Sequence, residues 1–552
     1  MRPSREWIGR GLVLAALAVV VALPFALRKE SSPALRADDT VVVITPHNEA
    51  IRSEFSRGFE RWYRARTGRS VAVDWRVIGG TSEITRFLES EYKGSFQLHW
   101  TRTLGRKWND NVQRSFDNPK VVLDDTPEDD DEAQAARRAF LASDVGCGID
   151  VFFGGGTFDF IKQADAGRLV DSGIFERQPT WFTDAVIPEM HGGERFWAQD
   201  RLWVGAVLSS FGILYNRDSL QRLGVEREPS DWRDLTDPRY LGEIALADPT
   251  KSSSIGKAFE MVIQREMQVR LRELRQAAQP GTAPATIEQQ AVPEGWVRGL
   301  QVLQLAGANA RYFTDSSQKP PIDVGQGDAA AGMCIDFYGR SQAGVVSQRE
   351  RAGGTTRLGF ITPRGGSVFS VDPIALMRGA AHRDVAQDFI EYVLSAEAQN
   401  LWNFRAGEPG GPEVFSLRRL PVRRDSYAAE LTKFRSDPET DPYGEDNTFV
   451  YHGAWTGRLF TEMSFIVRVV CLDAHDELVD AWRAIIAAGM PADALAVLQD
   501  MSAVDYAHAG GRIKTVLAAK DPIAELRLGR ELSNHFRAQY ERAAELARSK
   551  TR

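Results

Sequence analysis

The sequence is poor in cysteine and carries no excess of positive charge. Its 552 residues include three cysteines, Cys147, Cys334 and Cys471, which lie far apart. This odd number and wide spacing argue against a disulfide framework or a cysteine-based metal site and leave room for one disulfide at most. The formal net charge of −7 and a pI near 5.8 provide no basic face of the kind that nucleic acid requires. We therefore expect a globular protein with no nucleic-acid partner.

The sequence also lacks the local motifs of common enzymes. It contains no Gly-x-Ser-x-Gly elbow, no His-Glu-x-x-His pair and no phosphate-binding loop ending in Gly-Lys-Ser/Thr. The eight histidines are scattered along the chain, and His47 stands out because it lies in a polar loop between an expected strand and an expected helix. We therefore expect a protein that is not an enzyme and holds no cofactor.

The first residues differ from the rest of the chain. Arg2, Arg5 and Arg10 precede the run 11–27, which has no charged residue. A basic start followed by a short apolar run is typical of a secretory signal, but a clean small-x-small cleavage site is missing. We predict that residues 1–38 are a signal peptide or an N-terminal membrane anchor. Either way, the remainder would lie in the periplasm or elsewhere outside the cytoplasm.

From residue 41 onward, short apolar segments alternate with segments of helical periodicity. Strand-like segments occur at 41–45, 71–78, 148–153 and 242–247, and each leads through a polar or glycine-rich turn into a helix. This alternation predicts an α/β protein with largely parallel sheets. Residues 92–142, which include the acidic run "DDTPEDDDE", are expected to form a solvated insertion. Residues 277–295 read as a Pro/Ala/Gln-rich connection, and the chain beyond 421 reads as mostly helical.

The four strand-to-helix turns share a chemistry. They read "TPHNE", "GGTSE", "GGGTFD" and "DPTKSSSIG". Ligands of open α/β sheets bind at this edge, and helix starts favour anions. Ordinary helix capping would explain any single turn, whereas four such turns together favour ligand binding. The candidate ligand-binding residues in these turns are Thr45, His47, Asn48, Gly80, Thr81, Ser82, Gly155, Gly156, Thr157, Ser252, Ser253 and Ser254.

Longer segments carry a resemblance to a known family. These segments are "VVVITPHNEAIRSEFSRGFERWY", "GIDVFFGGGTFDFIKQADAGRLVD", "SSFGILYNRD", "GDAAAGMCIDFYGR" and "TPRGGSVFSVDPIALMRGAAHRDVAQDFIEYVLSAEAQNLW". They resemble the periplasmic solute-binding proteins of ABC importers, family 1/6-like, in the branch that takes ferric ion, thiamine or phosphorylated compounds. The resemblance extends from about residue 41 to 402, apart from the insertion.

The resemblance implies a two-lobed type II (Venus flytrap) fold with a helical C-terminal extension. Lobe 1 would comprise residues 39–208, with the insertion 92–142, and lobe 2 residues 209–365. Residues 366–420 would return to lobe 1, and 421–552 would complete the lobes or form an extension. Such a protein acts as a monomer that closes on its ligand and presents it to a membrane permease.

The ferric-ion binders of this family use an adjacent tyrosine pair together with a histidine and an acidic residue. The corresponding position here reads Phe337-Tyr338, so one tyrosine is lost. We therefore expect a phosphorylated or carboxylated ligand and no metal, with Asp336 and Tyr338 bonding its hydroxyl groups opposite His47. Ferric ion held by His47 and Tyr338 is one alternative, and a membrane-anchored sensor or scaffold protein is another.

Overall fold

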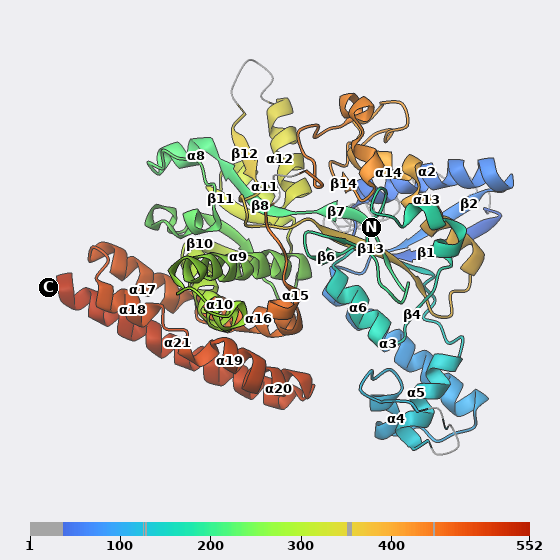
Figure 1. Cartoon of the computed structure of the whole chain (residues 1–552), viewed down its shortest axis with the longest axis horizontal. Helices are drawn as coiled ribbons and strands as arrows, with labels where there is room; N and C mark the ends of the chain where they lie inside the picture. The colour runs from blue at the N-terminus through green and yellow to red at the C-terminus, as the bar shows by residue number, and fades with distance from the viewer. Residues whose placement is uncertain (1–36, 125, 127–129, 350–355, 445–447, 552) are drawn as a thin grey trace, which may run out of the picture.

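Two separate β-sheets divide the chain into two lobes that lie side by side (Figure 1). The structure is a computed structural model that describes residues 37–124, 126, 130–349, 356–444 and 448–551. Lobe 1 contains the N-terminal strands and lobe 2 the middle of the chain. The chain crosses between them more than once, so each lobe is assembled from distant segments.

The sheet of lobe 1 has the strand order β14-β7-β13-β3-β1-β2, with β4 also paired to β13. Strands β1, β2 and β3 are parallel to one another, whereas β13 runs antiparallel to β3 and β7. The parallel strands β1, β2 and β3 agree with the α/β fold that the sequence predicts. The strands are β1 (Asp39–Ile44), β2 (Val71–Arg76), β3 (Val151–Phe153), β4 (Leu169–Val170), β7 (Val204–Ser209), β13 (Ser370–Met377) and β14 (Leu420–Pro421).

Helices cover both faces of this sheet, because the buried side chains of its strands point alternately to either side. Helices α2, α13 and α14 enclose one apolar cluster, and α3 and α6 enclose the other with the small helices α4 and α5. The helices are α2 (Glu49–Thr67), α3 (Thr81–Leu98), α4 (Asp110–Ser115), α5 (Glu132–Ala142), α6 (Thr157–Asp165), α13 (Arg383–Leu394) and α14 (Ala396–Asn403). A small hairpin of β5 (Met190–His191) and β6 (Glu194–Arg195) follows before β7.

The sheet of lobe 2 has the order β10-β9-β11-β8-β12. Helices α11 and α12 pack on one face and the long pair α9 and α10 on the other. The strands are β8 (Phe211–Asn216), β9 (Ile244–Ala247), β10 (Ala310–Thr314), β11 (Ala331–Ile335) and β12 (Leu358–Ile361). The helices are α8 (Arg217–Arg222), α9 (Ser253–Ala277), α10 (Pro284–Ala308), α11 (Lys319–Gln326) and α12 (Asp336–Arg349).

Two segments that cross between the lobes run next to each other. Strand β7 of lobe 1 continues through Ser210 into β8 of lobe 2, and residues 362–369 lead from β12 back to β13. The hydroxyl groups of Ser210 and Thr362 lie 3.3 Å apart and join the two crossings. These two neighbouring segments are direct connections between the sheets of the two lobes.

The C-terminal helices form a layer on lobe 2 (Figure 1), where they share one apolar core with α9 and α10. Trp482 donates from Nε1 to Asn309 Oδ1 at 2.9 Å, and Trp296 donates from Nε1 to the Val504 carbonyl at 3.0 Å. The predicted helical region is therefore an integral extension of lobe 2. Its helices are α15 (Gly453–Thr456), α16 (Phe460–Val467), α17 (His475–Ala487), α18 (Ala492–Leu498), α19 (Tyr506–His508), α20 (Lys514–Ala518) and α21 (Pro522–Thr551).

Two expectations for irregular segments are wrong in part. Helix α3 continues past the expected start of the insertion, and Tyr92 and Phe96 are fully buried in the core of lobe 1. The expected connection 277–295 is largely helical, because α10 begins at Pro284 and passes through Pro293. Packing between α9 and the C-terminal helices holds this segment helical despite the lost backbone hydrogen bond at Pro293.

The three cysteines are buried and unpaired. Within the described ranges, no helix is both long and apolar enough to cross a membrane. The run 11–27 lies outside the described residues, and so does part of the acidic run at 125 and 127–129.

Candidate ligand-binding cleft

The first predicted loop follows β1 and lies in the interior between the lobes. Thr45 is fully buried, and its Oγ1 accepts a hydrogen bond from the His47 amide at 3.1 Å. Asn48 caps α2, accepting from the Ile51 amide at 3.1 Å. The side chain of Asn48 therefore already has a structural role as an N-cap.

His47 is held as a neutral base. Its ring meets Phe153 edge-on, with the ring centroids 4.6 Å apart, and its Nε2 accepts a hydrogen bond from Arg419 Nη1 at 3.0 Å. Burial lowers the pKa of His47, and the positive charge of Arg419 lowers it further, although Asp372 at 3.9 Å acts in the opposite direction. The acceptor nitrogen of His47 is therefore already hydrogen-bonded to the guanidinium group of Arg419.

The glycines of the third loop allow this close packing. Gly154 and Gly155 have φ values of +89° and +114°. A Cβ on Gly154 would lie 2.5 Å from the His47 ring, and one on Gly155 would lie 2.5 Å from the Thr81 methyl group. Only glycine tolerates both the left-handed backbone and the contact.

Three helix starts meet between the lobes. The hydroxyl of Thr81, at the start of α3 in lobe 1, directly contacts the hydroxyl of Ser253 at the start of α9 in lobe 2. Ser253 also donates to Asp159 Oδ2 at 3.1 Å, from the first turn of α6. Burial raises the pKa of Asp159, and hydrogen bonds from Ser253 and Thr81 partly offset that rise. The carboxylate of Asp159 therefore occupies the position at which the helix starts would attract an anion.

Arg419 is the central cleft residue that the sequence analysis missed. Its side chain is 1% exposed and pairs with Asp372 at 2.6 Å, and it also donates to Ser209. The guanidinium carbon lies 4.4 Å from the centroid of the Phe337 ring in lobe 2. Arg419 thus connects both lobes through a hydrogen-bonded ion pair and a cation–π contact.

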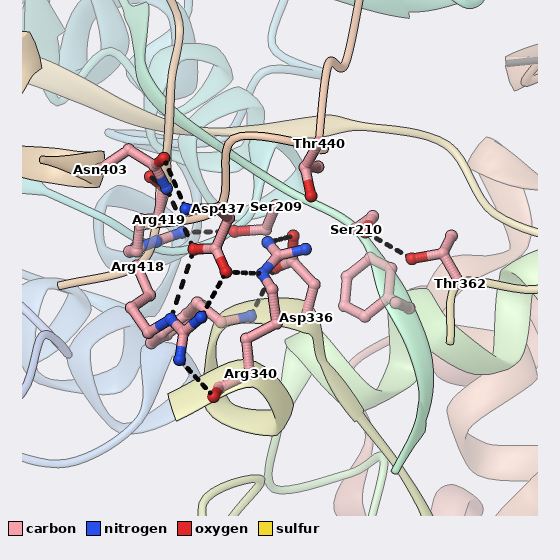
Figure 2. Close-up of polar contacts among 12 residues, drawn as sticks. Ser209, Ser210, Asp336, Arg340, Thr362, Asn403, Arg418, Arg419, Asp437 and Thr440 are labelled. Carbon is pink, nitrogen blue, oxygen red and sulfur yellow. Dashed lines mark hydrogen bonds and ion pairs between the residues drawn. The ribbon is translucent and has the colours of Figure 1, made fainter. Parts of the chain in front are cut away.

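Asp336 belongs to a neighbouring network that Figure 2 shows in detail. Asp336 pairs with Arg340 of α12, while Arg418 donates to the Arg340 carbonyl at 3.0 Å and pairs with Asp437 at 2.7 Å. Burial raises the pKa of Asp336, and the cation of Arg340 opposes this rise. Asp336 therefore has a partner from its own helix in this arrangement.

Tyr338 follows Asp336 on the same helix and is half-buried, its ring lying 4.1 Å from that of Phe337. Burial raises the pKa of Tyr338 to about 12, so its hydroxyl is a neutral donor at physiological pH. An iron ligand would need to be tyrosinate, and this environment opposes that ionisation.

A cavity of about 360 Å³ lies between the lobes next to the meeting point of the helix starts. Lobe 1, lobe 2 and the start of the C-terminal helical region all contribute to its walls. The predicted residues on its walls are Gly156, Thr157, Ser253 and Ser254. The aromatic residues on its walls are Phe158, Trp203, Phe211, Tyr451 and Phe460.

The remaining predicted residues lie around this region but not on the cavity wall. Gly80 is exposed at the start of α3, Ser82 is half-buried in its first turn, and Gly155 is buried behind Thr81. Ser252 caps α9, accepting from the Ile255 amide at 3.5 Å. The structure thus brings the second, third and fourth loops together, and places the first loop beside Arg419.

Lys257 lines the cavity between two carboxylates. Its ammonium lies 2.7 Å from Glu194 Oε1, 3.0 Å from Glu260 Oε2 and 3.6 Å from the centroid of the Tyr451 ring. Burial alone would lower the pKa of Lys257, but the two carboxylates outweigh it and the pKa lies well above its ordinary value. Burial raises the pKa of Glu194. No local motif indicates this cluster, because its members come from β6, α9 and the C-terminal region.

A larger groove of about 950 Å³ borders one of the segments that cross between the lobes. Its walls come from α12, β12, the segment 362–369 and residues 439–441. None of the predicted ligand loops contributes to it. We therefore assign the ligand site to the smaller cavity, where these loops converge.

Residues 149–413 match the family model described as bacterial extracellular solute-binding protein. The chain is 29% identical over 257 residues to an uncharacterized protein from Haemophilus influenzae, covering 46% of this chain and 60% of that protein. It is 24% identical over 198 residues to the phosphoglycerate transport regulatory protein PgtC of Salmonella typhimurium, covering 36% of this chain and 40% of that protein. The chain spans about half the length of the curated relatives that it matches.

Solved structures with a similar arrangement include the periplasmic binding protein AfuA from Actinobacillus pleuropneumoniae, with fructose-6-phosphate bound. It is 16% identical, with a TM-score of 0.46 over 81% of this chain and 98% of that chain. Iron-bound HitA from Pseudomonas aeruginosa is 15% identical, with a TM-score of 0.44 over 78% of this chain and 99% of that chain.

Proposed function

We propose that the chain, whose residues 149–413 match the model of the bacterial extracellular solute-binding proteins, captures a small ligand between its lobes for the permease of an ABC importer. The proposed place of action is outside the cytoplasm. Anchoring through the run 11–27 is part of this proposal. An alkaline-phosphatase fusion after residue 40 would be active if the chain is exported and inactive if it is not.

The observation that carries the proposal is the cavity between the lobes. Its walls come from both lobes, and four residues of the predicted strand-to-helix loops lie on them. A ligand in that position contacts both lobes only when they are together, so its binding energy favours the closed arrangement. This coupling is the property that a transport receptor needs.

For the ligand's chemistry, we propose an anionic group, such as a phosphate or a carboxylate, bound beside Arg419. A planar guanidinium matches both of these groups in a bidentate manner. The ligand would compete with Asp372, which pairs with Arg419 and also lines the cavity. Binding with a Kd of about 1 μM needs about −8 kcal/mol. Since a hydrogen bond to a charged group contributes about 1.5–3 kcal/mol, several such contacts must act together.

The arrangement around His47 disfavours the ferric-ion alternative. Arg419 donates to His47 Nε2, so a metal ion would have to displace a guanidinium and then lie next to its positive charge. Phe337 provides a ring face for Arg419 in place of a second phenolate. Ferric binding therefore requires displacing Arg419 from His47, whereas a phosphate or carboxylate ligand replaces Asp372 and leaves the guanidinium in place.

Calorimetry on the purified full-length chain tests the proposal. Phosphorylated sugars, carboxylates and ferric citrate are titrated separately. We expect a phosphorylated or carboxylated compound to bind and Arg419→Gln to weaken that binding. The control Arg64→Gln, on the exposed face of α2, should leave it unchanged. Tight ferric binding with a tyrosinate charge-transfer band that Tyr338→Phe abolishes would overturn the ligand assignment. Absence of binding to every class would overturn the function itself.

A further inference from the structure

The cavity between the lobes holds a cluster that an anionic ligand group does not explain. Glu194 and Glu260 both lie within 3.0 Å of the single ammonium of Lys257. The side chains of the two glutamates are 5% and 1% exposed. With both carboxylates ionised, this buried cluster carries one more negative than positive charge.

The charged groups that face the cluster do not supply the missing cation. Arg195 lines the same cavity but pairs with Glu189, and Asp372 is already matched by Arg419. Glu260 receives further hydrogen bonds from the hydroxyls of Tyr451, at 2.8 Å, and Thr456, at 2.5 Å. Among the described residues, Glu194 has Lys257 as its single partner. The unmatched charge therefore resides mainly on Glu194, at the cavity wall.

The shape and lining of the cavity suit an organic cation. An uncompensated buried carboxylate is costly, and either a proton or a cation can relieve the cost. The aromatic side chains on the wall include those of Trp203, Tyr451 and Phe460. Aromatic faces attract alkylammonium groups, and the ring of Tyr451 already receives Lys257 in this way. Lys257 itself is not a free anion receptor, because both carboxylates engage its ammonium.

We infer that this cavity is the subsite for a ligand's ammonium group, with Glu194 as its main acceptor and the segment 451–460 as the wall that completes it. The inference rests on the proposed function and deepens it. Asp372 lines the cavity and pairs with Arg419, so a ligand that displaces Asp372 from Arg419 would span both groups. The ligand class is then a zwitterion with an anionic group at Arg419 and an amine at Glu194. The C-terminal helical region contributes to specificity through Tyr451.

The test uses matched pairs of probes on the full-length chain. A series of aminoalkyl phosphates of increasing length is compared by calorimetry with alkyl phosphates of the same length, and with diaminoalkanes. We expect the amine to improve affinity by about tenfold or more, because a charged hydrogen bond is gained in a desolvated site. Glu194→Gln should abolish most of that advantage. The control Glu176→Gln, at an exposed ion pair of lobe 1, should preserve it.

A second variant separates the roles of Lys257 and Glu194. Lys257→Met removes the competing ammonium, so binding of the amine probes should hold or strengthen. If Lys257 were the anion receptor, Lys257→Met would abolish binding of the alkyl phosphates, and the inference would be wrong. Melting temperatures of all variants confirm that each remains folded.

The outcomes of the two proposals are distinguishable. Alkyl phosphates that bind as tightly as their amino counterparts, unchanged by Glu194→Gln, overturn the ammonium subsite and leave the solute-binding function standing. Failure of every probe to bind overturns both. An amine-dependent gain that Glu194→Gln removes supports both.

Discussion

Two buried cations lie between the lobes, and their surroundings differ. Arg419 is 1% exposed and is matched by Asp372, His47, Ser209 and the face of Phe337. Lys257 is 15% exposed, borders a cavity and faces two carboxylates. The first cluster is filled and charge-balanced, whereas the second has space and an unmatched negative charge.

This difference indicates that the two clusters have different roles, one in stability and the other in ligand binding. The balanced, packed cluster around Arg419 holds the lobes together. A ligand can bind there only by replacing one of the groups that Arg419 already contacts. A cluster with an unmatched charge beside a cavity is suited to receive a new group. Breaking each cluster separately should therefore affect stability and ligand binding in different proportions.

The largest effect is expected from Arg419→Met. It leaves the half-buried Asp372 without its cation and removes the donor to the buried His47, so we expect a loss of about 3–5 kcal/mol in the free energy of unfolding. Lys257→Met should cost less, about 1–3 kcal/mol, because Glu260 keeps its two hydroxyl donors and Glu194, whose pKa burial raises, takes up a proton at the cavity wall. Chemical denaturation of both variants measures the two losses in the free energy of unfolding. Equal losses would contradict the distinction between the clusters.

The next largest loss of stability is expected from disturbing the packing around His47, which contacts Arg419. Gly154→Ala adds a Cβ at 2.5 Å from His47 to a backbone with positive φ, so we expect a cost of about 2–4 kcal/mol. Gly410→Ala is the matched control, because Gly410 has a φ of +74° but its nearest neighbour is 3.9 Å away. It should cost about 1 kcal/mol. A similar loss for both would show that the space around His47 is not tightly filled.

A smaller loss of stability should follow when the packing of the C-terminal helices on lobe 2 is weakened. Trp482→Phe keeps a six-membered aromatic ring but loses the fused pyrrole ring and the hydrogen bond to Asn309, and should cost about 2 kcal/mol. Lobe 2 and the C-terminal helices should still unfold together, since they share one core. Separate unfolding transitions for the two in the wild-type protein would contradict that shared core.

The smallest effect is the pH dependence at His47. Burial lowers the pKa of His47 below its ordinary 6.5, so the unfolded chain takes up a proton at this residue before the folded chain does. The stability contributed by neutral His47 is therefore complete above about pH 6.5 and falls as the pH drops toward the folded-state value, by at most about 1.4 kcal/mol per pH unit. His47→Gln should lack this component. Parallel stability profiles of the two proteins would contradict a buried, neutral His47.

The sequence was sufficient to predict the strands and helix starts, because alternating apolar segments and polar turns are local signals. Helices α2, α3, α6 and α9 begin within or next to the predicted turns. The insertion boundary was misplaced, because Tyr92 and Phe96 read as part of an irregular aromatic segment but pack in the core as the end of α3.

The cleft was predicted less completely, for a different reason. Arg419, Asp372 and Glu194 come from segments far from the four loops and belong to no motif, so only the tertiary structure brings them together. Asn48 and Ser252 are predicted ligand residues whose side chains cap helices instead. The sequence does not separate these two roles, because a polar residue at a helix start suits both. Helix starts in the sequence predict an attraction for an anion, but the carboxylate of Asp159, on the first turn of α6, already lies at their meeting point.

The central claim is that a ligand in the cleft brings the two lobes together. Spin labels at Arg64→Cys on α2 and Arg275→Cys on α9 report the distance between the lobes, and the three native cysteines are buried. We predict a broad distance distribution without ligand, and a single, shorter distance at saturation with the aminoalkyl phosphate that binds most tightly by calorimetry. The same distribution with and without that bound probe would contradict the account.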